Sequence, residues 1–238
     1  MKKYTRICAR IDLDAIEYNL EMMRRRLPSD TKMIGVIKMD GYGHGAAQIA
    51  KYVMEEKDYI WGYAAATPDE AALLRKKGIQ KPILVLGCTF PEQRDEMIRQ
   101  EIRMTCYTEE MARDVSERAG RLGKTAYIHI KLDTGMSRLG FLISEESADA
   151  IARAAGLPGI EAEGMFTHFS KADETDKAFT RGQMEKYLWM KAKLADRGVA
   201  FKLCHCSNSA GIIDMPEAAM DLVRAGIAMY GLYPSGEV

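Results

Sequence analysis

Residues whose side chains can do covalent chemistry stand where apolar stretches of the sequence end. Lys38 follows the apolar run 33–37 and precedes a loop with glycines at alternate positions, Gly41, Gly43 and Gly45. Such glycines let the backbone bend tightly around a ligand. A lone lysine here is often a surface residue whose alkyl stem covers apolar side chains. In the alternative interpretation, its amine forms a Schiff base with a carbonyl compound.

A second group of residues could hold a phosphate. The segments 208–210 and 225–227 follow two further apolar runs. In barrel enzymes the loops after the last two strands commonly bind phosphate through backbone N–H groups. The Ser209 hydroxyl could donate to the same phosphate, although Asn208 and Ser209 could equally do no more than cap a helix. A Schiff-base lysine together with a phosphate cup favours pyridoxal phosphate (PLP) as the cofactor.

Cationic and imidazole side chains also interrupt apolar stretches. Arg224 lies in the apolar segment 222–225. Its guanidinium needs an acceptor there, either the pyridine nitrogen of PLP or the carboxylate of a structural ion pair. His168 and His205 each end an apolar run, where a histidine is most often a hydrogen-bonded core residue. The cysteines on either side of His205 have no second ligand pair elsewhere in the sequence, so we expect no metal site.

The scaffold must bring these separated positions together. Short β-branched runs alternate with amphipathic stretches almost from end to end, which predicts βαβ units and a parallel sheet. The eight expected strands are 33–38, 59–65, 82–87, 103–107, 126–132, 161–169, 201–207 and 222–230. Eight such units in roughly 200–250 residues match a (β/α)8 barrel, whose active sites lie at the carboxyl ends of its strands. The expected fold class is therefore α/β, a TIM-type (β/α)8 barrel.

The competing architecture is a doubly wound open sheet. Such sheets usually carry a Gly-x-Gly-x-x-Gly loop after the first strand, and the loop 40–45 lacks that spacing. The six main expected helices are 48–56, 68–77, 91–100, 109–120, 145–155 and 177–197. A lead-in at about 5–30 is expected to contain a strand, 7–13, followed by a helix, 14–27.

The charge balance and the apolar runs of the sequence limit which kinds of molecule the protein is expected to bind. Lys plus Arg and Asp plus Glu each number 34, so the formal net charge is zero. This balance argues against a nucleic-acid partner or an anionic membrane surface. The sequence has no signal-peptide core and no apolar run near the ~18 residues of a membrane span. Five cysteines without a C-x-x-C pair indicate reduced core thiols. We expect a cytoplasmic protein that binds neither nucleic acid nor membrane.

Four motifs together resemble those of the alanine racemases. They are the PLP-lysine motif at Val36–Gly45, a second signature at Lys131–Gly140, and third and fourth signatures at His205–Ala210 and Arg224–Gly231. The motifs keep the order and spacing of that family, and the resemblance covers essentially the whole chain. Met39 and Gly41 replace small residues such as alanine, at positions that carry no chemistry. The serine racemases are close relatives of the same family.

The resemblance implies a fold-type III PLP enzyme. Lys38 would carry the cofactor and act as one of two acid/base groups at the substrate α-carbon. Tyr42, Ser209, Gly226 and Ile227 would hold the phosphate. The full set expected to bind the cofactor is Lys38, Tyr42, His168, His205, Asn208, Ser209, Arg224, Gly226 and Ile227.

The same resemblance assigns roles around the cofactor ring. Arg224 would pair with the pyridine nitrogen, with His205 behind it, and His168 would lie beside the ring. Arg138 would meet the ring hydroxyl and the substrate carboxylate. Lys131 matches a position that is sometimes a carbamylated lysine, which would then position Arg138. The expected catalytic residues are Lys38, Arg138 and His168.

The implied activity is interconversion of the L and D forms of alanine, or of serine, by two bases. An arginine cannot readily protonate the pyridine nitrogen, which favours return of the proton to the α-carbon over transamination. In full-length relatives the second base is a tyrosine of a β-rich C-terminal domain, contributed by the partner subunit of a homodimer. The chain 1–238 ends where that domain would begin, so we expect a barrel that binds PLP but racemises poorly alone.

Three other functions compete with this one. A non-catalytic PLP-homeostasis barrel would bind the same cofactor without turnover, but the lysine motif of those proteins lacks the Tyr-Gly-His-Gly loop found at 42–45. A Schiff-base aldolase would form an imine with its substrate and need no PLP. A purely structural module leaves the polar residues at the strand ends unexplained.

Overall fold

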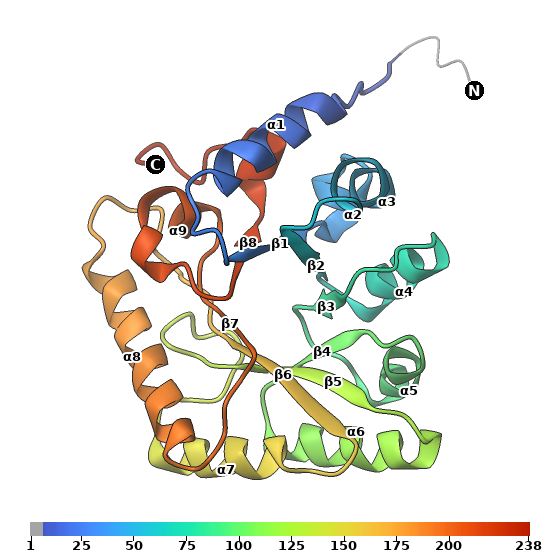
Figure 1. Ribbon diagram of the computed structural model, residues 1–238, viewed down its shortest axis with the longest axis vertical. Helices are drawn as coiled ribbons and strands as arrows, with labels where there is room; N and C mark the ends of the chain where they lie inside the picture. The colour runs from blue at the N-terminus through green and yellow to red at the C-terminus, as the bar shows by residue number, and fades with distance from the viewer. Residues whose placement is uncertain (1–6) are drawn as a thin grey trace.

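A computed structural model describes residues 7–238 and contains a closed ring of eight parallel strands surrounded by helices (Figure 1). The strands follow one another in chain order, and the first pairs with the last to close the ring. They are β1 Lys32–Val36, β2 Ile60–Ala65, β3 Ile83–Val85, β4 Arg103–Cys106, β5 Ala126–Lys131, β6 Ile160–Phe166, β7 Leu203–His205 and β8 Leu222–Ala225. The expected TIM-type α/β barrel is confirmed.

The connections are mostly helical and cover the outside of the ring. The α-helical elements are α1 Leu13–Arg24, α2 Lys38–Tyr42, α3 Ala46–Ile49, α4 Pro68–Lys76, α5 Pro91–Arg99, α6 Glu109–Leu122, α7 Glu145–Ala155, α8 Ala178–Ala195 and α9 Ser209–Asp214. A π-helical turn, η1 Ala50–Met54, continues α3, and η2 Pro216–Ala218 and η3 Ile227–Tyr230 are 3-10 turns. Thr67, Thr108 and Ser144 cap α4, α6 and α7 by accepting a backbone N–H three residues later.

Several expected strands extend too far toward their carboxyl ends. The eighth was expected to reach residue 230, but β8 ends at Ala225 and the chain then turns into η3. The sixth was expected to reach residue 169, but β6 ends at Phe166. Side chains beyond both ends remain buried, among them Phe169 and Met229. An apolar run in the sequence indicates that its residues are buried, but it does not show that they form a strand. These residues are buried in loops that pack over the barrel.

The expected lead-in strand at 7–13 is wrong. Residues 7–12 pair with no strand, and Ile7 is 88% exposed. The physical reason is that β1 already pairs with β2 and β8, so the closed barrel offers no free edge. Residues 5 and 6 of the lead-in lie outside the described residues. The expected helix is present as α1, which Asp12 caps by accepting from Ala15 N.

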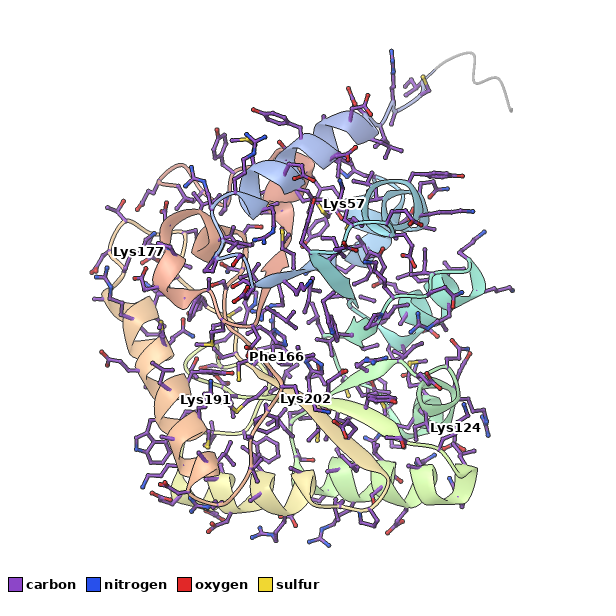
Figure 2. The ribbon with its side chains drawn as sticks, viewed as in Figure 1. Lys57, Lys124, Phe166, Lys177, Lys191 and Lys202 are labelled. Atoms are coloured by element: carbon purple, nitrogen blue, oxygen red, sulfur yellow. The ribbon has the colours of Figure 1, made fainter. Side chains whose placement is uncertain are left out.

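Apolar residues form two layers, one outside and one inside the ring of strands. The larger fills the space between strands and helices. The smaller, made by Ile34, Val36, Ala64 and Leu222, lies inside the barrel. Figure 2 shows Phe166 among the central strands, whereas Lys124 and Lys177 lie at the periphery. Within residues 7–238, no helix is both long and apolar enough to cross a membrane.

The five cysteines divide by burial. Cys106, Cys204 and Cys206 are buried, and Cys88 is half-buried. Cys8 is exposed, so the expectation of core thiols is wrong for that residue. It belongs to the segment before α1, which has no neighbouring layer to bury it.

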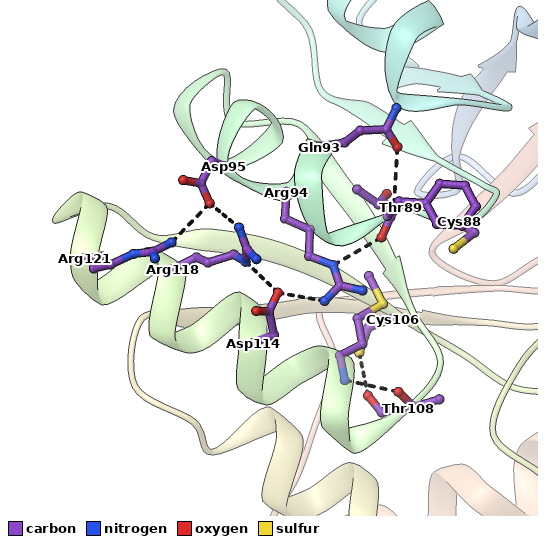
Figure 3. A network of polar contacts seen from close by, with 12 residues as sticks. Cys88, Thr89, Gln93, Arg94, Asp95, Cys106, Thr108, Asp114, Arg118 and Arg121 are labelled. Carbon is purple, nitrogen blue, oxygen red and sulfur yellow. Dashed lines mark hydrogen bonds and ion pairs between the residues drawn. The ribbon is translucent and has the colours of Figure 1, made fainter.

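Ion pairs join α5 to α6 on the outside of the barrel (Figure 3). Asp114 accepts from Arg94 at 2.7 Å and from Arg118 at 2.6 Å, and Arg118 also bonds Asp95 at 2.8 Å. Arg94 is nearly buried and additionally donates to the carbonyl of Thr89. Because every cation in this network is paired with a carboxylate, we interpret the network as a structural contact that joins the two neighbouring helices.

Candidate active site

The carboxyl ends of the strands open into a cavity of about 480 Å³. Its lining comes from segments far apart in the sequence, at the edge where active sites of barrel enzymes occur. The predicted site residues that line it are Lys38, Tyr42, Lys131, Arg138, His168, Asn208, Ser209, Arg224, Gly226 and Ile227. His205 is absent from the lining, because it lies buried beneath Arg224.

Lys38 is followed by a left-handed turn. Residues 39–42 all have φ between 51° and 63°. Such a conformation costs about 1–2 kcal/mol for each residue other than glycine. Strain of this kind persists only where the surroundings hold it, and it often marks a functional site.

Two carboxylates hold the turn in place. Asp40 Oδ1 accepts from Ala46 N at 2.9 Å. Glu70 of α4 accepts from Met39 N at 2.9 Å and, through its other oxygen, from the backbone N–H at position 66 at 2.7 Å. The turn is thereby fixed to the end of β2, and the Lys38 ammonium lies 5.6 Å from the centre of the Tyr42 ring.

Two hydroxyl groups flank a small space above Gly226. Ser209 Oγ accepts from Gly226 N at 3.1 Å and from Ala228 N at 3.2 Å, which leaves its hydrogen free to donate. A Cβ atom added to Gly226 would lie 3.5 Å from Ser209 Oγ and 3.7 Å from the Tyr42 hydroxyl. Burial raises the pKa of Tyr42, so its hydroxyl keeps its proton. This cradle, formed by Tyr42, Ser209 and Gly226, offers two hydroxyl donors to an oxyanion.

Arg224 lies at the floor of the cavity and is 2% exposed. One terminal nitrogen donates to His205 Nδ1 at 2.6 Å. The other donates to the carbonyls of Thr167 at 2.8 Å and Cys206 at 2.7 Å, and lies 3.3 Å from His168 Nδ1. Burial lowers the pKa of Arg224 to about 10, which still leaves it cationic at neutral pH. The cavity floor is therefore a fixed cation whose donors are held by several acceptors.

The two predicted histidines are neutral. Burial and, after it, the charge of Arg224 hold the pKa values of His168 and His205 well below the ordinary value. The charge of Arg138 lowers the pKa of His168 further. Neutral imidazoles can accept hydrogen bonds from the guanidinium.

Lys131, at the end of β5, and Arg138, on the loop that follows, line the cavity across the barrel from Lys38, which follows β1. Lys131 is buried and donates to the carbonyl of Leu132 at 2.6 Å. Burial and, secondarily, the charge of Arg224 lower the pKa of Lys131 to about 8. Arg138 is exposed, on a loop that Asp133 closes by accepting two backbone N–H groups at 3.0 Å.

Asn208 uses its side chain within the fold. Its oxygen caps α9 by accepting from Gly211 N at 3.0 Å, and its nitrogen donates to the carbonyl of Phe169 at 3.2 Å. The helix-capping alternative therefore describes these contacts, although Asn208 also lines the cavity.

Sequence reasoning missed two residues beneath the cavity, His129 and Glu163. His129 Nδ1 lies 3.0 Å from His205 Nε2, and its other nitrogen lies 3.4 Å from Glu163. Strand alternation could have found His129, because it lies two residues before Lys131 and shares its face of β5. No such signal points to Glu163, which a strand irregularity turns into the barrel.

Comparisons with known proteins identify similar chains. Residues 11–234 match the family model described as "Alanine racemase, N-terminal domain". The alanine racemase of Clostridium tetani is 44% identical over 232 residues, which are 98% of this chain and 59% of that protein. The alanine racemase of Desulforamulus reducens is 39% identical, over 98% of this chain and 62% of that protein.

Solved structures agree with these matches. The alanine racemase of Clostridium difficile 630 superposes with a TM-score of 0.93 at 44% identity, covering 96% of this chain and 59% of that one. A structure of that racemase in complex with cycloserine has the same TM-score and identity, with 62% of that chain covered. This chain thus spans about three fifths of the length of these relatives.

Proposed function

The chain belongs to the alanine racemase family, and on this premise we propose that it is the PLP-binding barrel of an enzyme that interconverts L- and D-alanine. The observation that carries the proposal is the convergence of Lys38, Arg224 and the Ser209 cradle on one cavity. A cavity of about 480 Å³ lies within the usual range for small-molecule sites. We also propose that the enzyme works in the cytoplasm as a homodimer.

The residues present fit PLP. Ser209 and Tyr42 would donate to the phosphate, and the space above Gly226 would receive it. Arg224 would donate to the pyridine nitrogen, and Lys38 would hold the cofactor aldehyde covalently. When bound, PLP would stabilise the electron pair left at the substrate α-carbon after its proton departs.

One of the two proton transfers that racemisation needs is assigned to a residue of this chain. Lys38 would remove the α-proton from one face of the substrate and could return it to that face. Arg224 stays cationic and would keep its own protons, so the proton returns to the α-carbon rather than to the ring. Arg138 would orient the substrate carboxylate. Inversion needs a proton delivered to the other face, and we assign no residue of this chain to that step.

Hydrogen exchange at the substrate α-carbon tests whether this chain can remove and return the α-proton on one face without inverting the substrate. With PLP present in D2O, we expect one alanine enantiomer to exchange its α-proton with retention, because Lys38 reaches one face. Exchange should exceed inversion by about 10²–10⁴-fold, the usual contribution of one positioned base. The measurement is deuterium incorporation by NMR together with chiral analysis, repeated with serine. PLP binding without exchange beyond that of free PLP would indicate the non-catalytic carrier instead.

Replacing Ser209 with alanine is expected to weaken PLP binding about tenfold, since charge-assisted hydrogen bonds contribute about 1.5–3 kcal/mol. The hydroxyl that orders the backbone at Gly226 and Ala228 would also be lost. A fluorescence titration with PLP measures the dissociation constant, and Ser29→Ala, an exposed serine distant in the sequence, serves as control. Equal affinities for the two variants would rule out the phosphate role.

We further propose that Lys131 carries a carbamate. Its neutral amine would add to CO2, forming an N–C bond and releasing a proton to solvent. Because the pKa of Lys131 is lowered to about 8, the reactive neutral fraction is half at that pH and falls as the pH drops. The product would be an anion close to the cations Arg224 and Arg138.

A carbamate signal should therefore increase as the pH rises through about 8. ¹³C NMR with labelled bicarbonate measures it, and Lys131→Ala should lack the signal. The exposed Lys202→Ala variant should retain it. If the signal is the same in wild type and Lys131→Ala, the modification is elsewhere.

A further inference from the structure

A continuous line of hydrogen bonds leads from Arg224 into the barrel, away from the cavity. Arg224 Nη1 contacts His205 Nδ1 at 2.6 Å, and His205 Nε2 contacts His129 Nδ1 at 3.0 Å. His129 Nε2 then lies 3.4 Å from Glu163 Oε2. Both imidazoles are fully buried. The four side chains form a relay that begins at the cavity floor and ends at a carboxylate.

Two strand irregularities build the lower part of this relay. In β2, the register against β1 passes from Ile60 to Gly62, so Trp61 is an extra residue. In β6, the register against β5 passes from Ala162 to Gly164, so Glu163 is an extra residue. Bulges of this kind turn a side chain to a new direction.

Both extra residues contact the same imidazole. The Trp61 ring lies 5.6 Å from the His129 ring, and Glu163 bonds its Nε2. Gly164 leaves room for the ring, because a Cβ atom there would lie 2.5 Å from His129 Nδ1. The surroundings therefore fix the position of His129 on three sides.

Glu163 is ionised. Arg103 donates to its two oxygens at 3.0 Å and 3.3 Å. Burial alone would raise the pKa of Glu163, but the hydrogen bonds from His129 and Arg103 lower it to about 2. Arg103 itself packs against the Tyr127 ring at 4.4 Å. A paired carboxylate thus anchors the far end of the relay.

The two ends of the relay dictate one arrangement of protons. A carboxylate only accepts, so His129 Nε2 must donate to Glu163 and His129 Nδ1 must accept. His205 Nε2 then donates to His129, and His205 Nδ1 accepts from Arg224, which only donates. Each imidazole stays neutral because burial lowers the pKa values of both His129 and His205. Every hydrogen bond in the relay is satisfied in this arrangement.

We propose that Glu163 is a positioning residue for Arg224: acting through His129 and His205, it sets the histidine tautomers that fix the guanidinium at the cavity floor. The inference rests on the proposed function only for what Arg224 would contact in the cavity. If both histidine tautomers were reversed, His205 Nδ1 would carry a hydrogen that points at the Arg224 N–H group. The two hydrogens would repel, and the guanidinium would be displaced. The relay thus holds in place the Arg224 guanidinium, which would donate to the pyridine nitrogen.

Histidine tautomers can be read directly by ¹⁵N NMR of the chain labelled at histidine, without PLP. We expect wild type to carry hydrogen on Nε2, and not on Nδ1, of both His129 and His205. Glu163→Met should introduce the Nδ1–H form on at least one ring. Glu161→Gln, two residues away on the same strand and paired with Lys202, should leave the wild-type pattern.

Arg224→Met examines the other end of the relay. If Glu163 sets the tautomers, the Nε2–H pattern should persist without the guanidinium. The proposal is overturned if either wild-type ring carries hydrogen on Nδ1, if Glu163→Met keeps the wild-type pattern, or if Arg224→Met loses it. Wild type and Arg224→Met decide the matter if Glu163→Met does not fold.

PLP affinity supplies an independent readout. Glu163→Met should bind PLP about tenfold more weakly than Glu161→Gln, since a misplaced Arg224 loses a charge-assisted hydrogen bond. Equal affinities would contradict the positioning role. If even wild type fails to bind PLP, the proposed function fails, while the tautomer pattern still decides whether the relay exists.

Discussion

Lys38→Ala is expected to lower α-proton exchange by about 10³-fold or more, because under the proposed function it removes both the positioned base and the covalent tether to PLP. Borohydride treatment of wild type with PLP should fix the cofactor on Lys38, and mass spectrometry of the digested protein should locate it. The variant should gain no such mass. Its fold should persist, because Lys38 is half-buried and the turn after it is held by Asp40 and Glu70.

The matched control is Lys32→Ala, at the other end of β1, where the ammonium donates to a backbone carbonyl outside the cavity. It should keep both exchange and the borohydride adduct. The informative contrary result is an adduct on Lys131, the other amine that lines the cavity. A cofactor fixed there would move the proposed base to the opposite side of the site.

The barrel could be predicted from the sequence because strand and helix periods alternate clearly. Seven of the eight expected strand ends lie within three residues of the observed ends, and the eighth lies five residues too far. Strand ends are where barrel sites gather. That is why widely separated positions such as Lys38, His168 and Arg224 were expected together, and the structure does place them around one cavity. The lead-in strand failed because an alternating pattern cannot show that the barrel leaves no free edge.

Local geometry was harder to predict. The left-handed turn contains Met39, Asp40 and Tyr42, and of these residue types only aspartate is enriched at positive φ, which is too weak a signal to predict four such residues in a row. Glu163 was missed because the bulge in β6 changes which face it occupies, and a strict alternation assigns it to the face opposite Phe166. The individual roles of site residues came from family resemblance, since spacing alone left structural alternatives open for Arg224 and Asn208.

Gly140 closes the loop that carries Arg138, and its replacement by alanine is expected to have a large effect on folding. Its φ is 137°, a conformation that L side chains rarely adopt. A Cβ atom there would lie 2.5 Å from Asp133 N and 2.7 Å from the carbonyl carbon of Leu132. These are backbone atoms of the strand end and cannot move aside as a flexible side chain could.

The closure at Gly140 is a pair of backbone hydrogen bonds. Phe141 N donates to the carbonyl of Lys131 at 2.8 Å, and Asp133 N donates to the carbonyl of Phe141 at 2.9 Å. An added methyl group would push Phe141 away from the segment 131–133 and break these two hydrogen bonds. Lys131 and Arg138 would then lose their positions at the cavity. If Arg138 holds the substrate carboxylate as proposed, the substrate would then bind less well.

Gly140→Ala should therefore lower the free energy of unfolding by about 3 kcal/mol, the upper end of the usual cost of overpacking, because backbone atoms cannot move aside. Urea unfolding followed by circular dichroism measures it. Gly182→Ala is the matched control, because Gly182 lies within α8 and its Cβ would meet nothing within 4 Å. That change should raise the free energy of unfolding by about 0.5–1 kcal/mol. A loss below about 1 kcal/mol for Gly140→Ala would mean that the loop can open without disturbing the barrel.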